Sequence, residues 1–387
     1  MCSSDLGFAV RAFAADAPID AALKDPSRPP YDLVRDAARK PAAMLAFAGV
    51  KQGQVIADFM PGGGYYTRLL SKIAGTKGRV FAIVPRFGWA PPSPAPLTEA
   101  QKQQRDTAER MRQNGISRVL AVADTAGYGN IDVTSFAVDQ FGGQFSLPLQ
   151  ADLVWTSDNY HDLHTAMAAK ADGSPLDVVG LNKAIFAALK PGGVFVVVDH
   201  ASAKGAGFAV AQTLHRAEED AAKAEILSAG FTLDGESNVL ADAADDHTRK
   251  VFELHDTTDQ FALRFKKPAN APRDRRITNA EMKGYFGNSM ISLTPRHVFF
   301  HEDGTYQELG LPGEQAVQGG RWIADAMHHL CMQHDFDLRG TTTCYDIPVN
   351  KKVGDTWTSD TYGIGRMITF RLEKGYVYPP GVLDKKQ

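Results

Sequence analysis

The stretch "VIADFMPGGGYYT" combines residue types that can bind a charged ligand. Asp58 ends an apolar run, three consecutive glycines follow, and "YYTRLLSKIAG" then shows helical spacing of its apolar residues. A carboxylate at this point can bind an ammonium group, and glycines let a ligand approach where a Cβ would collide. The alternatives are an aspartate that caps the turn and a glycine run that is a plain tight turn. The candidate ligand-binding residues are Asp58, Pro61, Gly62, Gly63, Gly64, Tyr65 and Tyr66.

The stretch "ADLVWTSDNYHDL" places an imidazole beside a carboxylate, directly after another apolar run. Because imidazole titrates near neutral pH, His161 next to Asp162 can act as a general base. The alternative is a loop histidine that makes hydrogen bonds and takes no part in chemistry. We predict His161 and Asp162 as catalytic residues, and Asn159 and Tyr160 as ligand-binding residues.

Apolar runs that begin near residues 55, 78, 130, 151 and 194 alternate with segments of helical periodicity, such as residues 32–48. Strands alternating with helices predict a doubly wound, mainly parallel α/β sheet. Ligands of such sheets bind beyond the carboxyl ends of the strands, so the two stretches above should meet. The same rule adds Asp139, after the third run, as a ligand-binding candidate. Asp199 and His200 repeat the histidine-aspartate pairing after the fifth run, as further candidates.

The pattern changes at "KKPANAPRDRR". Beyond it, short β-rich runs such as "HVFFHEDGTYQEL" and "RMITFRLEKGYVY" are bounded by turn signals, among them aspartate-glycine. This predicts a second, small and mainly antiparallel β domain over residues 275–387.

Three segments together, "VIADFMPGGGYYT", "ADLVWTSDNYHDL" and "LKPGGVFVVVD", resemble the class I S-adenosylmethionine-dependent methyltransferases. With "RDAARKPAAMLAFAGVKQG" before them and "ADDHTRKVFELHDTTDQFALRFKKP" after them, they resemble a narrower group of exported methyltransferases. The resemblance covers roughly residues 30–268 and implies a Rossmann-like methyltransferase domain over residues 15–268. It also implies S-adenosylmethionine as the cofactor, bound over residues 62–64, and a small-molecule substrate near residues 159–162.

The chain departs from the family pattern in two places. A glycine usually stands two residues after the acidic residue, where this chain has Met60 followed by Pro61. The second strand usually ends in an acidic residue that binds both ribose hydroxyls, where this chain has Val84-Pro85-Arg86. Losing a bidentate, charge-assisted contact should weaken cofactor binding. Dinucleotide binding would lack the same acid, and the glycine spacing fits it less well.

The C-terminal segments "ITNAEMKGYFGNSM", "FFHEDGTYQELG" and "GGRWIADAMHHLC" resemble a small secreted bacterial β domain that carries no catalytic motif. His328, His329 and His334 lie around Cys331, but their spacing is not that of a metal site. We therefore predict no metal site in the chain. Cys331 and Cys344 flank a predicted β-hairpin and form either a disulfide or two buried thiols.

The N-terminus carries signs of export. "MCSSDL" resembles a translated sequencing adapter, and "AFAADAP" resembles the cleavage region of a secretory signal peptide, so residues 1–14 are interpreted as an artefact and a signal-peptide remnant. We expect a periplasmic or secreted protein, with a cytoplasmic one as the alternative. A disulfide between the two C-terminal cysteines would fit an oxidising compartment.

Composition limits the functional classes. The 387 residues have a formal net charge of −3, which argues against a general nucleic-acid binder. No apolar run reaches the ~18 residues of a membrane-spanning helix. The function favoured is a methyltransferase acting on a small molecule. The alternative is a non-catalytic exported binding protein on the same scaffold, and the oligomeric state is left open.

Overall fold

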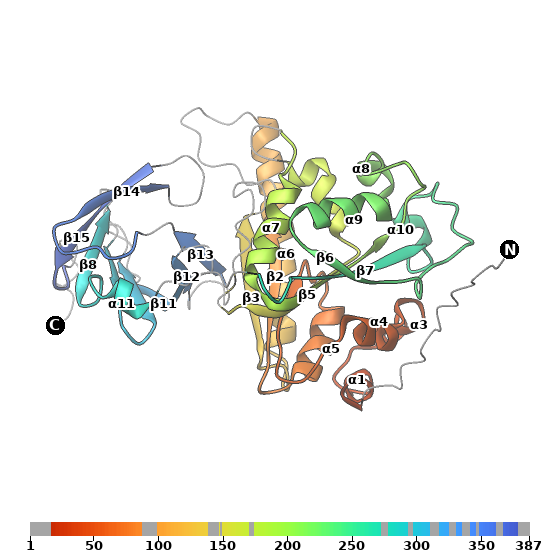
Figure 1. The fold of residues 1–387 in the computed structure, drawn as a ribbon, viewed down its shortest axis with the longest axis horizontal. Coiled ribbons are helices and arrows are strands. Elements are labelled where there is room, and N and C mark those ends of the chain that lie inside the picture. The colour runs from red at the N-terminus through yellow and green to blue at the C-terminus, as the bar shows by residue number, and fades with distance from the viewer. Residues whose placement is uncertain are drawn as a thin grey trace.

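The computed structural model describes most of the chain (Figure 1). The residues that it describes are 17–86, 99–137, 147, 149–169, 174–271, 278–292, 297–309, 317–324, 330–334, 341–345, 348–360 and 367–377.

The N-terminal part is built on a mixed sheet of seven of the described strands, in the order β3-β2-β1-β4-β5-β7-β6. Strands β1 to β5 run parallel to one another, and β7 is antiparallel to both β5 and β6. The predicted doubly wound α/β sheet is confirmed. The strands are β1 (Val55–Phe59), β2 (Arg79–Arg86), β3 (Ile131–Ala137), β4 (Ala151–Ser157), β5 (Leu189–His200), β6 (Thr232–Ser237) and β7 (Gln260–Lys266).

Helices cover both faces of this sheet, and each face has its own apolar core. On one face, side chains of α1, α4, α5 and α6 pack against the strands. On the other face, η1, α7 and α9 do so. The helices are α1 (Ala17–Leu23), α2 (Pro30–Leu33), α3 (Asp36–Arg39), α4 (Pro41–Ala48), α5 (Tyr65–Ala74), α6 (Glu99–Ala123), η1 (Tyr160–His164), η2 (Ala166–Ala168), α7 (Val178–Ala188), α8 (Ala211–Leu214), α9 (Glu219–Ser228) and α10 (Val251–Leu254).

The helix expected over residues 32–48 is broken. Lys40 has a φ of 42°, in the left-handed region, and separates α3 from α4. The cause is Pro41, because a proline disfavours the α conformation of the residue before it. The break leaves α3 as a separate short helix that carries Arg39 at its C-terminal end.

The C-terminal part is an antiparallel sheet of eight of the described strands, in the order β14-β15-β8-β9-β10-β11-β12-β13. The predicted mainly antiparallel β region is confirmed, and it has a separate aromatic-rich core that includes Tyr285, Trp322 and Trp357. The elements are α11 (Asn279–Met282), β8 (Asn288–Ser292), β9 (His297–Phe300), β10 (Thr305–Leu309), β11 (Val317–Ala324), β12 (Leu330–His334), β13 (Thr341–Tyr345), β14 (Thr356–Asp360) and β15 (Met367–Lys374).

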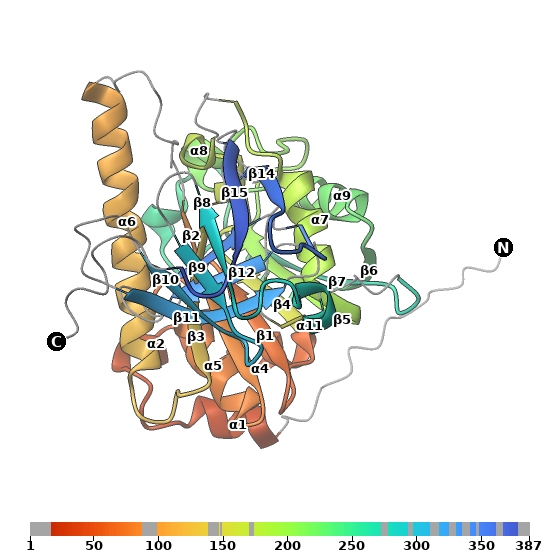
Figure 2. The ribbon, with the colours of Figure 1, turned by 90° about the vertical axis from the view of Figure 1, so that its left-hand side faces the viewer.

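The two sheets meet at one point along their edges. Strand β13 pairs in parallel with β3 through Thr341 and Ser135, so the pairing of strands continues from one sheet into the other. Figure 2 shows the C-terminal sheet in front of the α/β sheet, with the long helix α6 along one side. None of the described helices is long and apolar enough to span a membrane.

The chain order of the strands determines where a ligand can bind. After β1 the chain moves outward through β2 and β3, then crosses to β4 on the opposite side of β1. The carboxyl ends of β1 and β4 therefore flank a topological switch point, which is where open α/β sheets bind ligands. The two candidate stretches leave the sheet at these ends.

Candidate functional site: two adjoining cavities at the switch point

A cavity of about 130 Å³, here called the loop cavity, lies between the glycine turn and the end of β4. Gly62 and Gly63 are exposed at its floor, and a Cβ added at Gly63 would meet no atom within 4 Å. Gly64 has a φ of 79° and caps the N-terminus of α5. Arg68 holds the turn in place, because its guanidinium donates to Gly63 O at 3.2 Å and is paired with the buried Asp32 at 2.7 Å.

Met60 keeps the shape that the family pattern assigns to a glycine. Its φ is 61°, in the left-handed region that glycine enters freely and other residues enter at a cost of roughly 1–2 kcal/mol. Its side chain is buried and lines the loop cavity. Met60 therefore has a backbone conformation that a glycine would also adopt, while its side chain forms part of the cavity wall.

Asp58 brings a buried carboxyl group to the loop cavity. Its side chain is 2% exposed, and the hydrogen bond that the described structure gives it comes from the Thr67 hydroxyl at 2.5 Å. Burial raises the pKa of Asp58 to about 7, and the hydrogen bond from Thr67 opposes this shift. The group is therefore poised to ionise when a cation reaches it.

Tyr65 and Tyr66 both lie in the wall of the loop cavity. The Tyr65 hydroxyl donates to Asp36 at 2.6 Å, and the Tyr66 ring packs on Trp155 with centroids 4.5 Å apart. Arg39 lies over both tyrosine rings, at 5.0 and 5.9 Å from their centroids. Burial raises the pKa of both phenols, so they remain neutral donors.

Trp155 adds a buried donor that the described residues leave without a partner. Its side chain is fully buried in β4, it lines the loop cavity, and its Nε1 has no hydrogen-bond acceptor among the residues that the structure describes. A buried N–H without an acceptor costs roughly 1–3 kcal/mol. The loop cavity thus has an acidic group and an unsatisfied donor in its wall.

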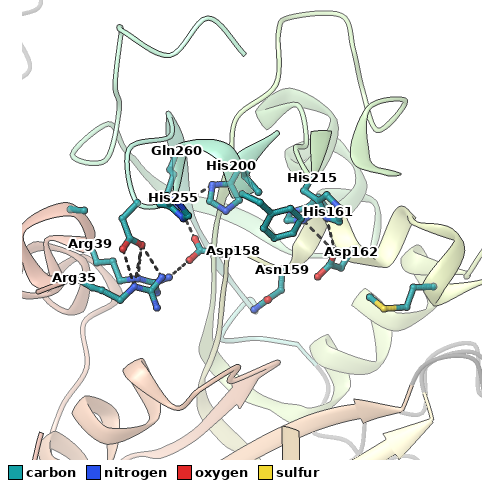
Figure 3. Close-up of a pocket in the computed structure, with 15 residues that line it drawn as sticks. Arg35, Arg39, Asp158, Asn159, His161, Asp162, His200, His215, His255 and Gln260 are labelled. Carbon is teal, nitrogen blue, oxygen red and sulfur yellow. Dashed lines mark hydrogen bonds and ion pairs between the residues drawn. The ribbon is translucent and has the colours of Figure 1, made fainter. Parts of the chain in front are cut away.

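A larger cavity of about 640 Å³, here called the histidine cavity, adjoins the first. The two share part of their lining, namely Arg35, Arg39, Asp158 and Asn159. In Figure 3 the two arginines lie at one end of the histidine cavity, His161 and Asp162 lie at the other, and Asp158 lies between them. Its remaining lining residues are Ala38, Met167, His200, His215, Val251, Phe252, His255, Asp256 and Gln260.

His161 is held between two carboxylates. Its Nδ1 lies 2.8 Å from Asp199 Oδ1, its Nε2 lies 3.3 Å from Asp162 Oδ1, and its side chain is 3% exposed. Burial alone would lower its pKa, but the charge of Asp199 and the contact with Asp162 raise the pKa of His161 to about 10. An imidazole that is already protonated at neutral pH cannot accept a proton. The raised pKa favours Asp162, the partly exposed carboxylate of the pair, as the proton acceptor, and a catalytic role of His161 stays a prediction.

Asp199 holds the backbone in place at this end of the histidine cavity. It is fully buried at the end of β5 and accepts hydrogen bonds from the backbone N–H groups of His161 and His200, at 2.6 and 2.8 Å. His200 contacts the Thr258 hydroxyl at 2.7 Å, and burial lowers the pKa of His200. His200 is therefore a neutral imidazole at pH 7, beside a charged one.

Asp158 links the two cavities. It follows β4 with a φ of 62°, and it accepts hydrogen bonds from Arg39 at 2.6 Å and from Gln260 at 2.7 Å. Burial would raise its pKa, but Arg39 and His200 together hold the pKa of Asp158 below its usual value. Arg35 completes the network through Asp256, at 2.8 Å. On the wall that the two cavities share, Asp158 is thus paired with Arg39, and Arg35 is paired with Asp256.

Asn159 and Tyr160 have different positions, although they are adjacent in sequence. Asn159 lines both cavities, and its Nδ2 donates to Met60 O at 2.8 Å, which ties the exit of β4 to the glycine turn. Tyr160 lines neither cavity. Its buried hydroxyl donates to Glu225 at 2.6 Å and accepts from Asn182 at 2.7 Å. The ligand-binding prediction for the Tyr160 side chain is therefore corrected to a core position.

The structure brings most of the predicted site residues together at the switch point. Asp58, Pro61, Gly62, Gly63, Tyr65, Tyr66 and Asn159 line the loop cavity, and His161 and Asp162 line the histidine cavity. Asp139 lies outside the described residues, as do His328 and His329. Cys331 and Cys344 are direct partners in the backbone register of β12 and β13.

Several residues of the site were not predicted from the sequence. Arg35 and Arg39 stood in a segment predicted only as a helix, and His215, His255 and Gln260 lie far along the chain in loops or at a strand start. Asp158 carried a usable signal, because it directly follows an apolar run that ends at a strand exit. The others become neighbours only through the fold.

The chain was compared with known families and structures. No family model matches it, and no curated protein matches its sequence. It is similar to the solved structure of a SAM dependent methyltransferase from Aquifex aeolicus, at 16% identity and a TM-score of 0.37, covering 62% of this chain and 94% of that chain. It is also similar to the structure of an arsenic(III) S-adenosylmethionine methyltransferase from Chlamydomonas reinhardtii, at 16% identity and a TM-score of 0.37, covering 72% of this chain and 81% of that chain.

A third similar structure is Aeropyrum pernix fibrillarin in complex with natively bound S-adenosyl-L-methionine, at 14% identity and a TM-score of 0.33, covering 60% of this chain and 76% of that chain. Two of these three structures are described as S-adenosylmethionine methyltransferases, and the third holds S-adenosyl-L-methionine. Identities and TM-scores at this level transfer neither a substrate nor the role of any residue.

Proposed function

We propose that the protein is an S-adenosylmethionine-dependent methyltransferase that acts on a small molecule. The observation that carries the proposal is the buried carboxyl group of Asp58, which faces an open glycine turn and has no counter-charge among its described partners. A ligand with a positive charge would remove the cost of ionising this group. S-Adenosylmethionine carries such a charge on its amino-acid end.

The groups in the wall of the loop cavity suit an amino-acid ligand. The Asp58 carboxylate would accept a hydrogen bond from the ligand's ammonium group. The absence of a side chain at Gly63 leaves room for that end of the molecule.

The histidine cavity is the proposed substrate site, because it adjoins the loop cavity and shares four of its lining residues. When bound, the cofactor supplies an activated methyl group. The chain's part is to hold the acceptor in line with that group and to exclude water, and such positioning supplies much of the catalysis of a transfer reaction. Asp162, with a side chain 19% exposed, is the carboxylate that can take a proton from the acceptor.

Calorimetric titration with S-adenosylmethionine tests the proposal, with Gly63→Val as the diagnostic variant. A Cβ at Gly63 meets no protein atom within 4 Å, so the fold should tolerate valine while the ligand's space is filled. Gly129→Val is the matched control, because Gly129 is equally open and lies outside both cavities. We expect the first variant to lose binding and the second to keep it.

Two outcomes would defeat this assignment. Equal affinity in both variants would mean that the turn is structural and that the ligand binds elsewhere. Absence of heat and of thermal stabilisation with millimolar ligand would favour the non-catalytic binding protein.

We also propose that the protein is exported and that Cys331 and Cys344 form a disulfide. What supports the bond is the backbone register, in which the two residues are opposite each other on neighbouring antiparallel strands, a pairing whose Cα separation is compatible with a disulfide. Peptide mapping of the exported protein without reduction tests both ideas. A cross-linked peptide pair is expected, and two free thiols in that sample would contradict the disulfide.

A further inference from the structure

His161, Asp162 and His215 converge at one end of the histidine cavity. Each offers one ligand atom, and these atoms all lie within 4.8 Å of one another. Asp162 Oδ1 lies 3.3 Å from His161 Nε2 and 3.6 Å from His215 Nδ1. Two imidazoles and one carboxylate form a ligand set that binds divalent transition metals in proteins.

These separations fit the first shell of a metal ion. Around Zn²⁺, ligand atoms at 2.0–2.1 Å in a tetrahedral arrangement lie about 3.3 Å from each other. The two distances to Asp162 match this value within a few tenths of an ångström. His215 caps the C-terminus of the short helix α8, and its ring stands edge-on to the His161 ring with centroids 5.4 Å apart.

The surroundings of His161 are those of a metal-bound histidine. Its second ring nitrogen, Nδ1, lies 2.8 Å from Asp199 Oδ1, and Asp199 is itself fully buried and held by two backbone N–H groups. A carboxylate in this position fixes the ring and directs Nε2 at a metal. The metal would take the place of a proton on Nε2. Phe252 packs against the His215 ring, with centroids 4.6 Å apart, and holds the third ligand near the others.

We propose that His161, Asp162 and His215 bind one Zn²⁺ ion, which revises the prediction that the chain has no metal site. Three protein ligands leave one position open toward the histidine cavity, as in sites that bind a water or a substrate oxygen. The inference does not depend on methyl transfer, because it concerns binding of the ion alone. It modifies the proposed function, because Asp162 would then bind the ion rather than take a proton, and the ion would act as a Lewis acid where the acceptor molecule would lie.

The test is calorimetric titration of the chelator-treated, full-length protein with Zn²⁺, without any other ligand. We expect one site that is weakened at least tenfold in His215→Asn, and weakened likewise in Asp162→Asn. Asparagine suits position 215 because the φ of 57° there is left-handed, which asparagine tolerates. His255→Asn is the matched control, because His255 also lines the cavity, has a φ of 51°, and is not one of the three ligands.

Circular dichroism of each variant confirms that it is folded before the affinities are compared. Titration with Co²⁺ provides a second readout, because a tetrahedral site with nitrogen and oxygen ligands gives strong visible absorption that should disappear in His215→Asn. A Zn²⁺ affinity that is the same in the wild type, His215→Asn and Asp162→Asn would overturn the proposal and place the ion elsewhere. The absence of any Zn²⁺ binding by the wild type would also overturn it.

Discussion

The loop cavity and the histidine cavity share a wall, yet they treat buried charge in opposite ways. In the loop cavity, Asp58 is buried with a hydroxyl as its described partner, and burial raises its pKa to about 7. In the histidine cavity, acidic groups are matched by cations, as in the pairs of Asp199 with His161 and of Asp158 with Arg39. Asp58 therefore has no cation among its described partners, although Arg35 and Arg39 also line the loop cavity, whereas Asp199 and Asp158 are each paired with a cation.

This difference indicates which cavity depends on its ligand. A buried carboxylate without a counter-ion destabilises the folded protein when it ionises, and a cationic ligand would remove that penalty. A balanced network keeps its geometry without a ligand and can hold a second molecule in a fixed orientation. The loop cavity is therefore suited to a charged cofactor and the histidine cavity to a positioned substrate.

The largest expected effect on stability comes from removing one partner of a charge pair in the histidine cavity. Asp199→Asn keeps the shape of the side chain but removes the counter-charge of His161, and removal of one partner of a buried pair costs about 3–5 kcal/mol. The folded-state pKa of His161 is about 10, against 6.5 in the unfolded chain, so its stabilising charge is present below pH 6.5 and lost toward pH 10. Urea denaturation of the chelator-treated, metal-free protein at pH 6 and pH 9 should show the larger loss at pH 6.

A second variant should stabilise the protein, because it removes the buried carboxyl group that has no counter-charge among its described partners. Asp58→Asn should raise the free energy of unfolding at pH 8 by up to about 4 kcal/mol, at 1.36 kcal/mol per pKa unit. The folded-state pKa of Asp58 is about 7 and its ordinary value is 3.8, so the wild type loses stability as the pH rises from 4 to 7. The two proteins should therefore be nearly equal at pH 4 and diverge up to pH 7 in urea denaturation.

Asp25→Asn is the control for that experiment. Burial opposes the shift, but hydrogen bonds from Ser27, Lys72 and Tyr128 lower the pKa of Asp25 to about 2, so its charge stabilises the folded chain. This variant should lose stability at pH 8. A loss of stability in Asp58→Asn as well would contradict the claim that Asp58 is unbalanced.

The smallest expected effect concerns a residue outside both cavities. Tyr160→Phe removes the hydroxyl that bonds Glu225 and Asn182, which should cost roughly 1–2 kcal/mol of stability. Affinity for S-adenosylmethionine should not change, because the Tyr160 side chain lines neither cavity. Thermal unfolding and calorimetry of the same sample check both parts. A large loss of affinity with little loss of stability would show that Tyr160 does contribute to ligand binding.

Local sequence signals were sufficient where the structure depends on neighbouring residues. The apolar run, the glycines and the helical spacing after Asp58 predicted the strand, turn and helix, and strand alternation placed this turn beside the exit of β4. Even the departure at Met60 preserved the turn, because the residue adopts the conformation of a glycine.

The charge states could not be predicted in this way, because they depend on contacts between distant segments. His161 was predicted as a base from its neighbour Asp162, but its ring also contacts Asp199, which lies 38 residues away and raises the pKa of His161. The same holds for Asp158, whose partners Arg39 and Gln260 come from a helix end and a strand start. Tyr160 follows Asn159 directly, yet the short helix η1 turns its side chain into the core.

The pH dependence of S-adenosylmethionine binding tests the central claim most directly, namely that the buried charge of Asp58 is reserved for a cationic ligand. Calorimetry between pH 5 and pH 7.5 should show affinity rising by up to about tenfold per pH unit and levelling above pH 7, because the pKa of Asp58 is about 7 in the free protein. Asp58→Asn should bind weakly at every pH. An affinity that does not change with pH, or an unchanged affinity in Asp58→Asn, would contradict the account.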